Sequence, residues 1–530
     1  MKQKWIHKSI ICGLFMIYLI VGIFLYKDYG ISTDERDERE STFVNIKYAL
    51  DTLGVDALDG ANGDLEKYDY RYYGIAMQVV PSVLEWMKGF PGGEAYHIRH
   101  LWTFLVCFAG YICFYRTCRK TLESVGLSLL GTAMVALYPR FFAEQFYNIK
   151  DMIFVAMVMI SMYATVMVIE SDYAVTWIIF FSIISALTTN VRIVGFLFPM
   201  LLVGYIIVEM IYQKMKRQTG WKSRKKRLRA FAILAAGFIF TYIICMPILW
   251  KHPIREVIKV FTKFSDYDQW NGIIVFMGQL LNKDQLPWYY IPVWVLISVP
   301  VWYHILFLLI VVTGIVCVVK KKCVVDMDIV FRHKYFIWAG LSALLPWLAT
   351  VILHSTLYNG WRHFYFILPL FVYMIVYGMR YFLTKCIINK VWKVVIVFAC
   401  IAGMVIQTGW IIRNHPYEMV YLNAACRKWG AEFDRDYWNL INMDLCRYIL
   451  ENDDSEKITV CTAGNIFMNF MTDEEKQRIQ LVDISENPKY YIETYHGLLG
   501  NDVAVNGYQD YHDIEIDGYK IGTIFIRQSD

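Results

Sequence analysis

Long apolar segments separated by short polar ones fill most of the chain, and only its C-terminal part lacks them. The first segment, Ser9 to Tyr26, has no charged residue, and about 18 apolar residues are enough for a helix to cross a membrane. Further segments of this kind follow it. The pattern predicts eleven membrane-spanning helices, at residues 9–26, 97–115, 126–143, 151–169, 173–189, 192–212, 230–249, 296–319, 335–353, 364–382 and 393–412.

Basic residues in the short loops predict the orientation of these helices, because Lys and Arg are enriched on the cytoplasmic side. Lys2, Lys4 and Lys8 precede the first segment and no cleavage site follows it, so we expect a retained signal anchor. The gaps after even-numbered segments are basic, whereas the gap at 170–173 is not. We therefore expect a multi-pass plasma-membrane protein with a cytoplasmic N-terminus. The basic gap residues are Arg116, Arg119, Lys120, nine between Lys214 and Arg229, Lys320 to Lys322, Lys385, Lys390 and Lys393.

The loop at residues 27–96 is expected outside and is acidic. Between Lys27 and Arg71 it carries 12 acidic and 6 basic residues. Ser32 and Glu35 have the spacing of a helix capping box. Apolar residues then recur at helical spacing, which predicts an amphipathic helix on the outer membrane surface. These apolar residues are Phe43, Ile46, Leu50 and Leu53.

Composition agrees with a membrane protein, since 57% of the residues are hydrophobic and only 19% are charged. The net charge of +5 reflects membrane orientation and not a nucleic-acid partner, because the basic residues lie between apolar segments and form no single face. The 12 cysteines include no CxxC pair, so they indicate neither a zinc site nor a disulfide framework.

Residues 413–530 have the composition of a soluble domain, and we expect them outside the cell, after a transmembrane domain at 1–412. The pattern predicts a helix at 436–452 and strands in KITVCTA, RIQLVDI and KIGTIFIRQ, hence a small α/β domain. Its first part, residues 415–438, is expected to pack on the membrane domain near the active face.

Several polar residues stand at the predicted outer ends of the membrane segments. Ionisable residues at such positions suggest function, although one Arg or Lys often only reaches toward the interface, and an acidic run often only begins a solvated helix. Acids and cations together on one side suggest a site that handles a phosphate and a hydroxyl. The candidates are Asp34, Glu35, Asn148, Lys150, Asp151, Arg192, Arg362 and His363.

Five segments, in this order, resemble the bacterial relatives of protein O-mannosyltransferases and lipid A aminoarabinose transferases, which are membrane glycosyltransferases of the C class in the family 39 group. One position departs from the family pattern, because Ile149 stands where a proline is usual. The segments are TDE at 33–35, PRFFAEQFYNIKD at 139–151, NVRIVGFLFP at 190–199, YNGWRHFYFILP at 358–369, and HPYEMVYLNAA with DRDYW at 415–438.

The resemblance implies inverting transfer of a sugar from a polyprenyl-phosphate donor to an acceptor hydroxyl at the outer face. It makes Asp34 the candidate general base, with Glu35 orienting it or the acceptor. Lys150, Arg192 and Arg362 are the candidate phosphate ligands, for which Lys and Arg are suited. His363 would hydrogen-bond the phosphate or the sugar. Asn148 and Asp151 complete the expected substrate-binding set.

Some points stay open in the sequence. Asp151 could be a metal ligand, an acceptor for sugar hydroxyls or a partner of Lys150. Nothing fixes a metal, and no dense carboxylate cage for calcium is present, so a divalent ion is an option only. Residues 251–294 could form a donor or acceptor loop, or an interfacial aromatic belt. The acceptor could be a protein, a lipid or an envelope polymer.

Two other functions fit a polytopic protein. A transporter or flippase of lipid-linked sugars is disfavoured, because no internal repeat is visible and the polar residues sit at segment ends and not at the midplane. A polymer or lipid ligase with a diphosphate-linked donor is disfavoured by the order of the motifs.

Overall fold

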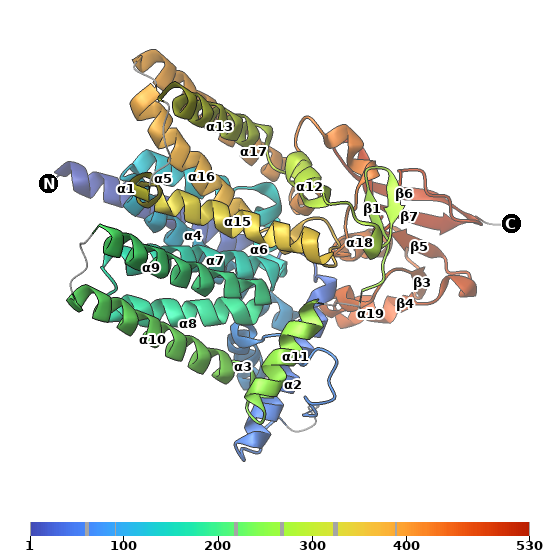
Figure 1. The fold of residues 1–530 in the computed structure, drawn as a ribbon. Coiled ribbons are helices and arrows are strands. Elements are labelled where there is room, and N and C mark those ends of the chain that lie inside the picture. Colours follow the sequence, from blue (N-terminus) through green and yellow to red (C-terminus); the bar gives the residue numbers. More distant parts are fainter. Residues whose placement is uncertain are drawn as a thin grey trace.

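Bundled helices form the larger part of the protein, and a small sheet domain stands at one end of them, with the two termini at opposite ends of the molecule (Figure 1). The structure is a computed structural model and describes residues 2–58, 63–90, 92–216, 221–265, 270–321, 327–386 and 389–528. The protein is thus a helical membrane protein with a C-terminal α/β domain, as the sequence predicts.

Eight helices in the described ranges are long and apolar enough to cross a membrane, and each overlaps most of one predicted segment. Their ends lie within a few residues of the predicted ones at most positions. The last helix ends two residues after the predicted domain boundary at 412. They are α1 (Lys2–Leu25), α4 (Gly92–Leu122), α7 (Asp151–Glu170), α9 (Leu197–Met215), α10 (Trp221–Ile244), α15 (Lys334–Leu353), α16 (Ile367–Tyr381) and α17 (Lys390–Asn414).

The other three predicted spans are not straight, full-length helices. The segment at 126–143 is bent by 62° between α5 (Val125–Ala136) and α6 (Pro139–Tyr147), and the segment at 296–319 is bent by 114° between α12 (Tyr290–Ser298) and α13 (Val301–Lys321). Pro139 and Pro300 stand at the two bends, where proline interrupts a helix. The third, α8 (Val175–Val191), is shorter. The described chain therefore has eight to ten candidate spans by length and composition, fewer than the predicted eleven.

Helix α7 lies at the centre of the bundle. In its apolar window 78% of the residues are buried, against 6% in α1. It packs against α4 and α8, and Gly110 of α4 permits close contact, because a Cβ there would lie 2.9 Å from Cα of Ala156. A helix that is apolar on all sides is stable in such a position. Its first residue, Asp151, is consequently buried.

Helix α2 (Thr33–Thr52) has Ser32 as its N-cap, as the capping-box spacing predicts, and lies beside α3 (Val79–Lys88) and α11 (Pro253–Ser265) (Figure 1). The face that it buries against the protein is polar and includes Glu35, Glu38, Thr42 and Asn45. The predicted apolar stripe is only partly buried at Phe43, Ile46 and Leu50, and its last member, Leu53, is 67% exposed. Its location on the membrane surface stays a prediction.

The C-terminal domain is a five-stranded mixed sheet of order β4-β3-β5-β7-β6. Helix α18 (Asn442–Asn452) is shorter than predicted, because Asn439 has a left-handed backbone (φ 56°) and residues 436–441 form a turn. Short helices α14 (Met327–Arg332) and α19 (Asp473–Arg478) complete the described α-helices. The strands are β3 (Ile458–Cys461), β4 (Ile479–Leu481), β5 (Tyr490–Glu493), β6 (Tyr508–Ile516) and β7 (Tyr519–Arg527).

A hairpin of β1 (Ile274–Phe276) and β2 (Gln279–Leu281) joins the loop at 251–294 to this domain. Met277 and Gly278 both have positive φ (52° and 73°), as a two-residue hairpin turn requires. The amide of Gly278 donates to the Glu432 carbonyl at 3.0 Å, and the amide of Asp434 donates to Val275 at 3.1 Å. The role of this loop in donor or acceptor binding stays a prediction.

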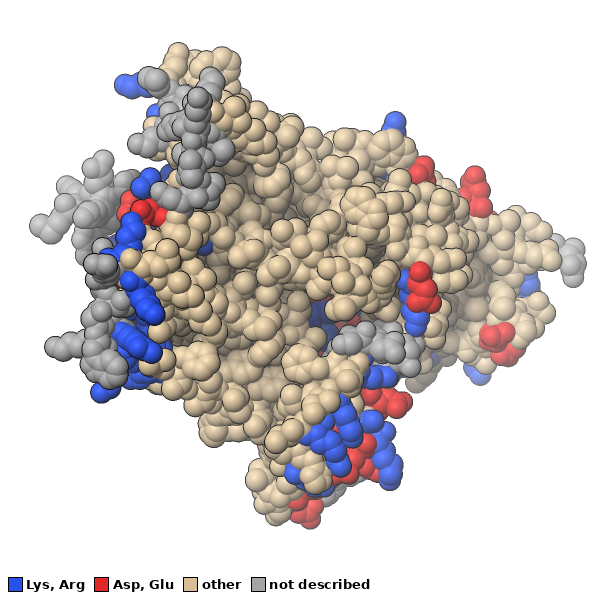
Figure 2. All heavy atoms as spheres, in the orientation of Figure 1, with Lys and Arg blue, Asp and Glu red and all other residues tan. Residues whose placement is uncertain are grey.

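Charged residues concentrate at the two ends of the bundle. Figure 2 shows Lys and Arg gathered at the end away from the sheet domain, a mixed group of charges near α2 and α11, and an almost uncharged band between them. The first group includes Lys214, Lys216, Arg224 and Lys225, which are exposed. The helical N-terminus lies at the same end (Figure 1), as the loop charges predict. Which end is cytoplasmic stays a prediction.

Candidate active site

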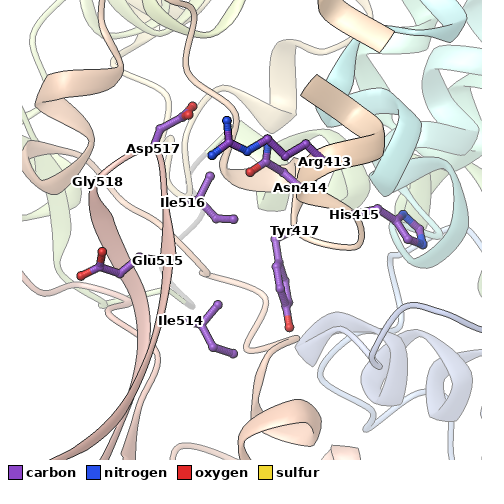
Figure 3. A pocket seen from close by; sticks show the side chains of 9 residues that line it. All are labelled: Arg413, Asn414, His415, Tyr417, Ile514, Glu515, Ile516, Asp517 and Gly518. Atoms are coloured by element: carbon purple, nitrogen blue, oxygen red, sulfur yellow. The ribbon is translucent and has the colours of Figure 1, made fainter. Parts of the chain in front are cut away.

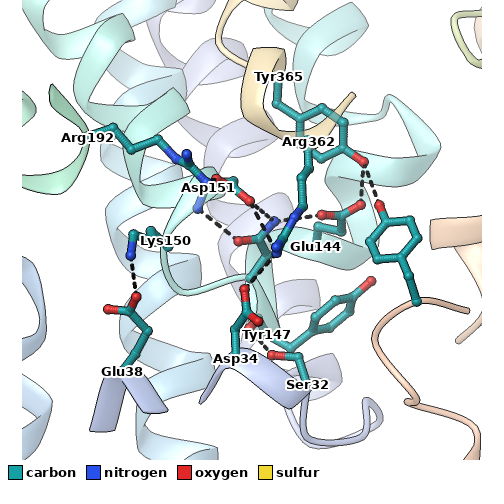
Figure 4. A network of polar contacts seen from close by, with 12 residues as sticks. Ser32, Asp34, Glu38, Glu144, Tyr147, Lys150, Asp151, Arg192, Arg362 and Tyr365 are labelled. Atoms are coloured by element: carbon teal, nitrogen blue, oxygen red, sulfur yellow. Dashed lines mark hydrogen bonds and ion pairs between the residues drawn. The ribbon is translucent and has the colours of Figure 1, made fainter. Parts of the chain in front are cut away.

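Most of the predicted site residues meet at the end of the bundle that faces the C-terminal domain (Figure 4). Helix α2 contributes Asp34, the turn between α6 and α7 contributes Asn148 and Lys150, and α7 begins at Asp151. Arg192 stands between α8 and the 3₁₀ turn η2 (Ile193–Phe196), and Arg362 opens the turn η5 (Arg362–Phe364). Residues up to 328 positions apart are therefore in contact.

A chain of ion pairs joins four of these residues. Nη1 of Arg362 donates to Oδ2 of Asp34 at 2.7 Å and lies 3.8 Å from Oδ2 of Asp151. Nη2 of Arg192 pairs with the other oxygen of Asp151. The side chains of Arg362 and Asp151 are 3% and 2% exposed, whereas that of Asp34 is 43% exposed. Within the network, the side chain of Asp151 is thus closed off from solvent, whereas solvent or a ligand can reach that of Asp34.

Lys150 turns away from Asp151 and pairs with Glu38. Its Nζ lies 2.5 Å from Oε1 of Glu38 and 3.6 Å from the centre of the Tyr73 ring. Both charged side chains are mostly buried, at 14% and 12% exposed. Glu38 is one helical turn after Asp34, so α2 places one acid toward each cation.

Asn148 and Glu144 hold Asp151 in place through hydrogen bonds. Oδ1 of Asn148 accepts a hydrogen bond from the Asp151 amide at 2.9 Å, and Nδ2 donates to Oε2 of Glu144 at 2.7 Å. The other oxygen of Glu144 accepts from the Tyr365 hydroxyl at 2.6 Å. The hydrogen bond from the Asp151 amide to the Asn148 side chain stabilises the turn at 148–151, where a proline in place of Ile149 would restrict the backbone. Asn148 is 2% exposed, so it acts here on Asp151 and not on solvent.

Glu35 lies outside this cluster. Its Oε1 accepts from the Ser32 amide at 2.8 Å, and its Oε2 lies 3.1 Å from Nε2 of His100. Neighbouring positions on a helix point in different directions, so Asp34 and Glu35 cannot face the same ligand closely. In this arrangement Glu35 fixes the start of α2.

Aromatic rings surround Arg362 and His363. The guanidinium carbon of Arg362 lies 5.0 Å from the Tyr358 ring centre and 4.6 Å from that of Trp438. The Tyr358 ring also meets His363 edge-on at 4.7 Å. Burial, together with the charges of Arg192, Arg362 and Lys150, holds the pKa of His363 well below 6.5. The imidazole is therefore neutral at pH 7 and can both donate and accept a hydrogen bond.

The cations also set the ionisation of Asp34. Burial raises the pKa of this carboxyl, but Arg362, followed by Lys150 and Arg192, more than offsets burial, so the pKa lies below its usual 3.8. Burial lowers the pKa of Lys150, and Arg192 adds to this, against the opposing effect of Glu38. Asp34 thus stays charged and occupies the cations in the absence of a ligand. Such an arrangement suits a site in which the phosphate of a ligand can replace this carboxylate at the cations.

Sequence reasoning missed Glu38, Glu144, Tyr365 and Trp438. Helical spacing contains a signal for two of them, since Glu38 follows Asp34 by four residues and Glu144 precedes Asn148 by four. Trp438 has no signal of this kind, although it closes the DRDYW motif in the segment 415–438, which the sequence predicts to lie near the active face.

Within the ranges that the structure describes, no group of three or more His, Cys, Asp or Glu side chains could hold a metal ion. A cavity of about 570 Å³ lies elsewhere, where the end of α17 meets strand β6 and the turn after it (Figure 3). It contains none of the predicted site residues. Its lining residues are Arg413, Asn414, His415, Tyr417, Ile514, Glu515, Ile516, Asp517 and Gly518.

No family model matches the chain, and no curated protein matches it at a significant level. Two kinds of solved structure resemble it in fold. ArnT from Cupriavidus metallidurans in the apo state is 13% identical, with 98% of each chain covered and a TM-score of 0.44. The same protein bound to undecaprenyl phosphate is 12% identical, with 97% of each chain covered and a TM-score of 0.41.

The second kind is the apo oligosaccharyltransferase from Archaeoglobus fulgidus, which is 9% identical, with 88% of this chain and 64% of that chain covered and a TM-score of 0.44. Similarity at this level establishes neither family membership nor activity.

Proposed function

We propose that the protein is an inverting membrane glycosyltransferase, which moves a sugar from a polyprenyl-phosphate donor to an acceptor hydroxyl at the outer face of the membrane. The observation that carries the proposal is the chain of ion pairs from the half-exposed Asp34 through Arg362 to Asp151 and Arg192. It sets a carboxylate that can accept a proton beside cations that can accept a phosphate. The five ordered motifs supply the reaction class.

The reaction follows from these groups. The acceptor hydroxyl gives its proton to Asp34 while its oxygen attacks the anomeric carbon. The bond from that carbon to the phosphate oxygen breaks, and its electron pair leaves with the polyprenyl phosphate. Arg362, Arg192 and Lys150 stabilise the charge that grows on the leaving phosphate. Attack from the side opposite the phosphate inverts the anomeric carbon.

Donor binding also prepares the base. A phosphate that enters beside Arg362 competes with Asp34 for the guanidinium, since both are anions that accept the same N–H groups. Asp34 then loses its strongest partner, and its proton affinity rises where the acceptor hydroxyl arrives. Neutral His363 can hydrogen-bond the phosphate or the sugar without adding charge.

The test is transfer of a labelled sugar from polyprenyl-phosphate donors in proteoliposomes that contain the wild-type protein or the Asp34→Asn variant. We expect labelled product with the wild type only. A flippase would move the labelled lipid across the bilayer and leave its sugar–phosphate bond intact, and a ligase would require a diphosphate-linked donor. Either result, or an Asp34→Asn variant of wild-type activity, would contradict the proposal.

A further inference from the structure

The C-terminal domain enters the candidate active site through the segment Asp434 to Leu440, which leads into α18. Tyr437 and Trp438 in this segment are each 1% exposed. The Tyr437 hydroxyl lies 3.4 Å from that of Tyr365, and the Trp438 ring meets Tyr147 edge-on at 6.1 Å. The segment thus packs against the end of α6 and against Tyr365, which follows the η5 turn of Arg362.

The backbone of Trp438 holds the start of α2. The amide of Thr33, the first residue of α2, donates to the Trp438 carbonyl at 3.3 Å. The first amides of a helix have no partner inside it, so this contact caps the helix next to Asp34. Gly30 strengthens the fit, because a Cβ there would lie 2.5 Å from the Leu440 carbonyl oxygen and would push the two segments apart.

The side chain of Trp438 holds Arg362. Its ring centre lies 4.6 Å from the guanidinium carbon, whose side chain is only 3% exposed. The attraction between a cation and an aromatic face is strongest when water is excluded, and Trp is the best of the aromatic residues for it. One residue of the C-terminal domain therefore contacts both Arg362 and Thr33, the residue that precedes Asp34.

We propose that Trp438 is a positioning residue that sets the geometry of the Asp34–Arg362 pair, which makes the C-terminal domain a part of the transfer site. This inference rests on the proposed function. In this role the Trp438 carbonyl fixes the start of α2, the helix that carries the base, and the indole ring fixes Arg362, the proposed phosphate ligand. Misplacement of such groups by about 1 Å can cost roughly a hundredfold in rate.

The test compares Trp438→Leu with Trp438→Phe in the full-length protein in proteoliposomes. Both keep the backbone carbonyl, but only phenylalanine keeps an aromatic face for Arg362. We expect Trp438→Leu to lower kcat about tenfold or more and Trp438→Phe to restore most of it. In the pH profile of kcat/KM, the acid limb is the range in which the rate falls as Asp34 takes up a proton. We expect this limb to move to higher pH in Trp438→Leu, since Arg362 is no longer held against Asp34.

Trp429→Leu is the matched control, because Trp429 is a 41% exposed tryptophan of the same domain. It is expected to keep the wild-type kcat and acid limb. A role in folding alone would lower the thermal stability of Trp438→Leu and leave the acid limb unmoved, which would overturn the inference. Unchanged kcat and acid limb in Trp438→Leu beside an active wild type would overturn it as well.

A second variant covers the case in which Trp438→Leu does not insert. Gly30→Ala drives Leu440 away from the start of α2 and is expected to move the acid limb in the same direction. A folded Gly30→Ala variant with the wild-type limb would contradict the inference. A wild-type protein that transfers no sugar from any polyprenyl-phosphate donor would instead refute the proposed function, and the inference with it.

Discussion

Asp34 is the one predicted site acid that combines a direct contact with a buried cation and substantial exposure, at 43% of its side chain. Asp151 is almost fully buried between two arginines, and Glu35 is held by Ser32 and His100. An acceptor can therefore reach Asp34 more easily than either of these neighbours. The assignment of the base rests on this difference in access.

The first prediction compares Asp34 with Asp37. Asp37 is also half exposed, and the cation that it pairs with among the described residues is its exposed neighbour Arg36, at 3.6 Å. We expect Asp34→Asn to reduce sugar transfer by roughly 10²-fold to 10⁴-fold, as loss of a general base does, and Asp37→Asn to change it little. Initial rates with labelled donor measure both. Equal losses in the two variants would indicate that the acidic run acts only through its total charge.

The pH dependence supplies a second prediction. Arg362 holds the pKa of Asp34 below 3.8 against the effect of burial, and His363 is neutral because its pKa lies well below 6.5. Asp34 loses its charge only as pH falls through this lowered value, so kcat/KM should stay constant between pH 7 and pH 5 as far as these groups control it.

The Arg362→Gln variant tests the sign of this effect. Without the guanidinium, burial raises the pKa of Asp34, so the acid limb of kcat/KM should move upward in pH. The limb is read from initial rates at limiting donor in buffers of constant ionic strength. A limb that stays in place would mean that Arg362 does not control the ionisation of Asp34.

At the scale of elements, α2 is held to α3 and α4 by an ion triad in which Glu85 and Arg99 are buried. Arg39 of α2 donates through Nε to Oε1 of Glu85 at 2.9 Å, and Arg99 of α4 donates to the other oxygen at 2.6 Å. The Arg99 side chain is fully buried. One carboxylate on α3 therefore compensates cations on two other helices and fixes the helix that carries Asp34.

The third prediction concerns this triad. Glu85→Gln removes the charge but keeps the size of the side chain, and it leaves Arg99 buried without its carboxylate. Loss of one partner of a buried pair typically costs about 3–5 kcal/mol, so the thermal unfolding temperature in detergent should fall clearly. Glu94→Gln, an exposed position in the first turn of α4, is the control and should change it little. Equal stability of the two variants would contradict this account.

At the scale of the whole molecule, the two ends of the bundle differ in charge and in what they carry. One end has the N-terminus and exposed basic residues, and the other has the C-terminal domain and the Asp34 cluster (Figures 1 and 2). The basic end is expected in the cytoplasm by the positive-inside rule. The site then faces outward, where a lipid-linked donor would be used.

The fourth prediction tests this orientation in intact cells. A cysteine at Ser485, exposed in the C-terminal domain, should react with a membrane-impermeant thiol reagent, and a cysteine at Lys225 should react only after the membrane is opened. Labelling of the unmodified protein is subtracted in each case. The reverse pattern would place the Asp34 cluster on the cytoplasmic side and would rule out transfer at the outer face.

Much of the architecture follows from local patterns. Every predicted apolar segment overlaps at least one helix, Ser32 and Glu35 mark the start of α2, and strand alternation locates β3, β4 and β7. These features depend on neighbouring residues and on the length needed to cross a membrane. The bends at Pro139 and Pro300 were missed, because apolar composition alone does not report helix direction.

Sequence by itself determined that this is a helical membrane protein with a C-terminal α/β domain, and it selected Asp34, Lys150, Asp151, Arg192 and Arg362 among its candidates, since charge at the end of an apolar segment is visible locally. Only the tertiary structure decided which charges meet. It paired Lys150 with Glu38, turned Glu35 toward His100 and brought Trp438 against Arg362. The physical reason is that such contacts depend on how helices rotate and pack, and short-range patterns contain no record of partners hundreds of residues away.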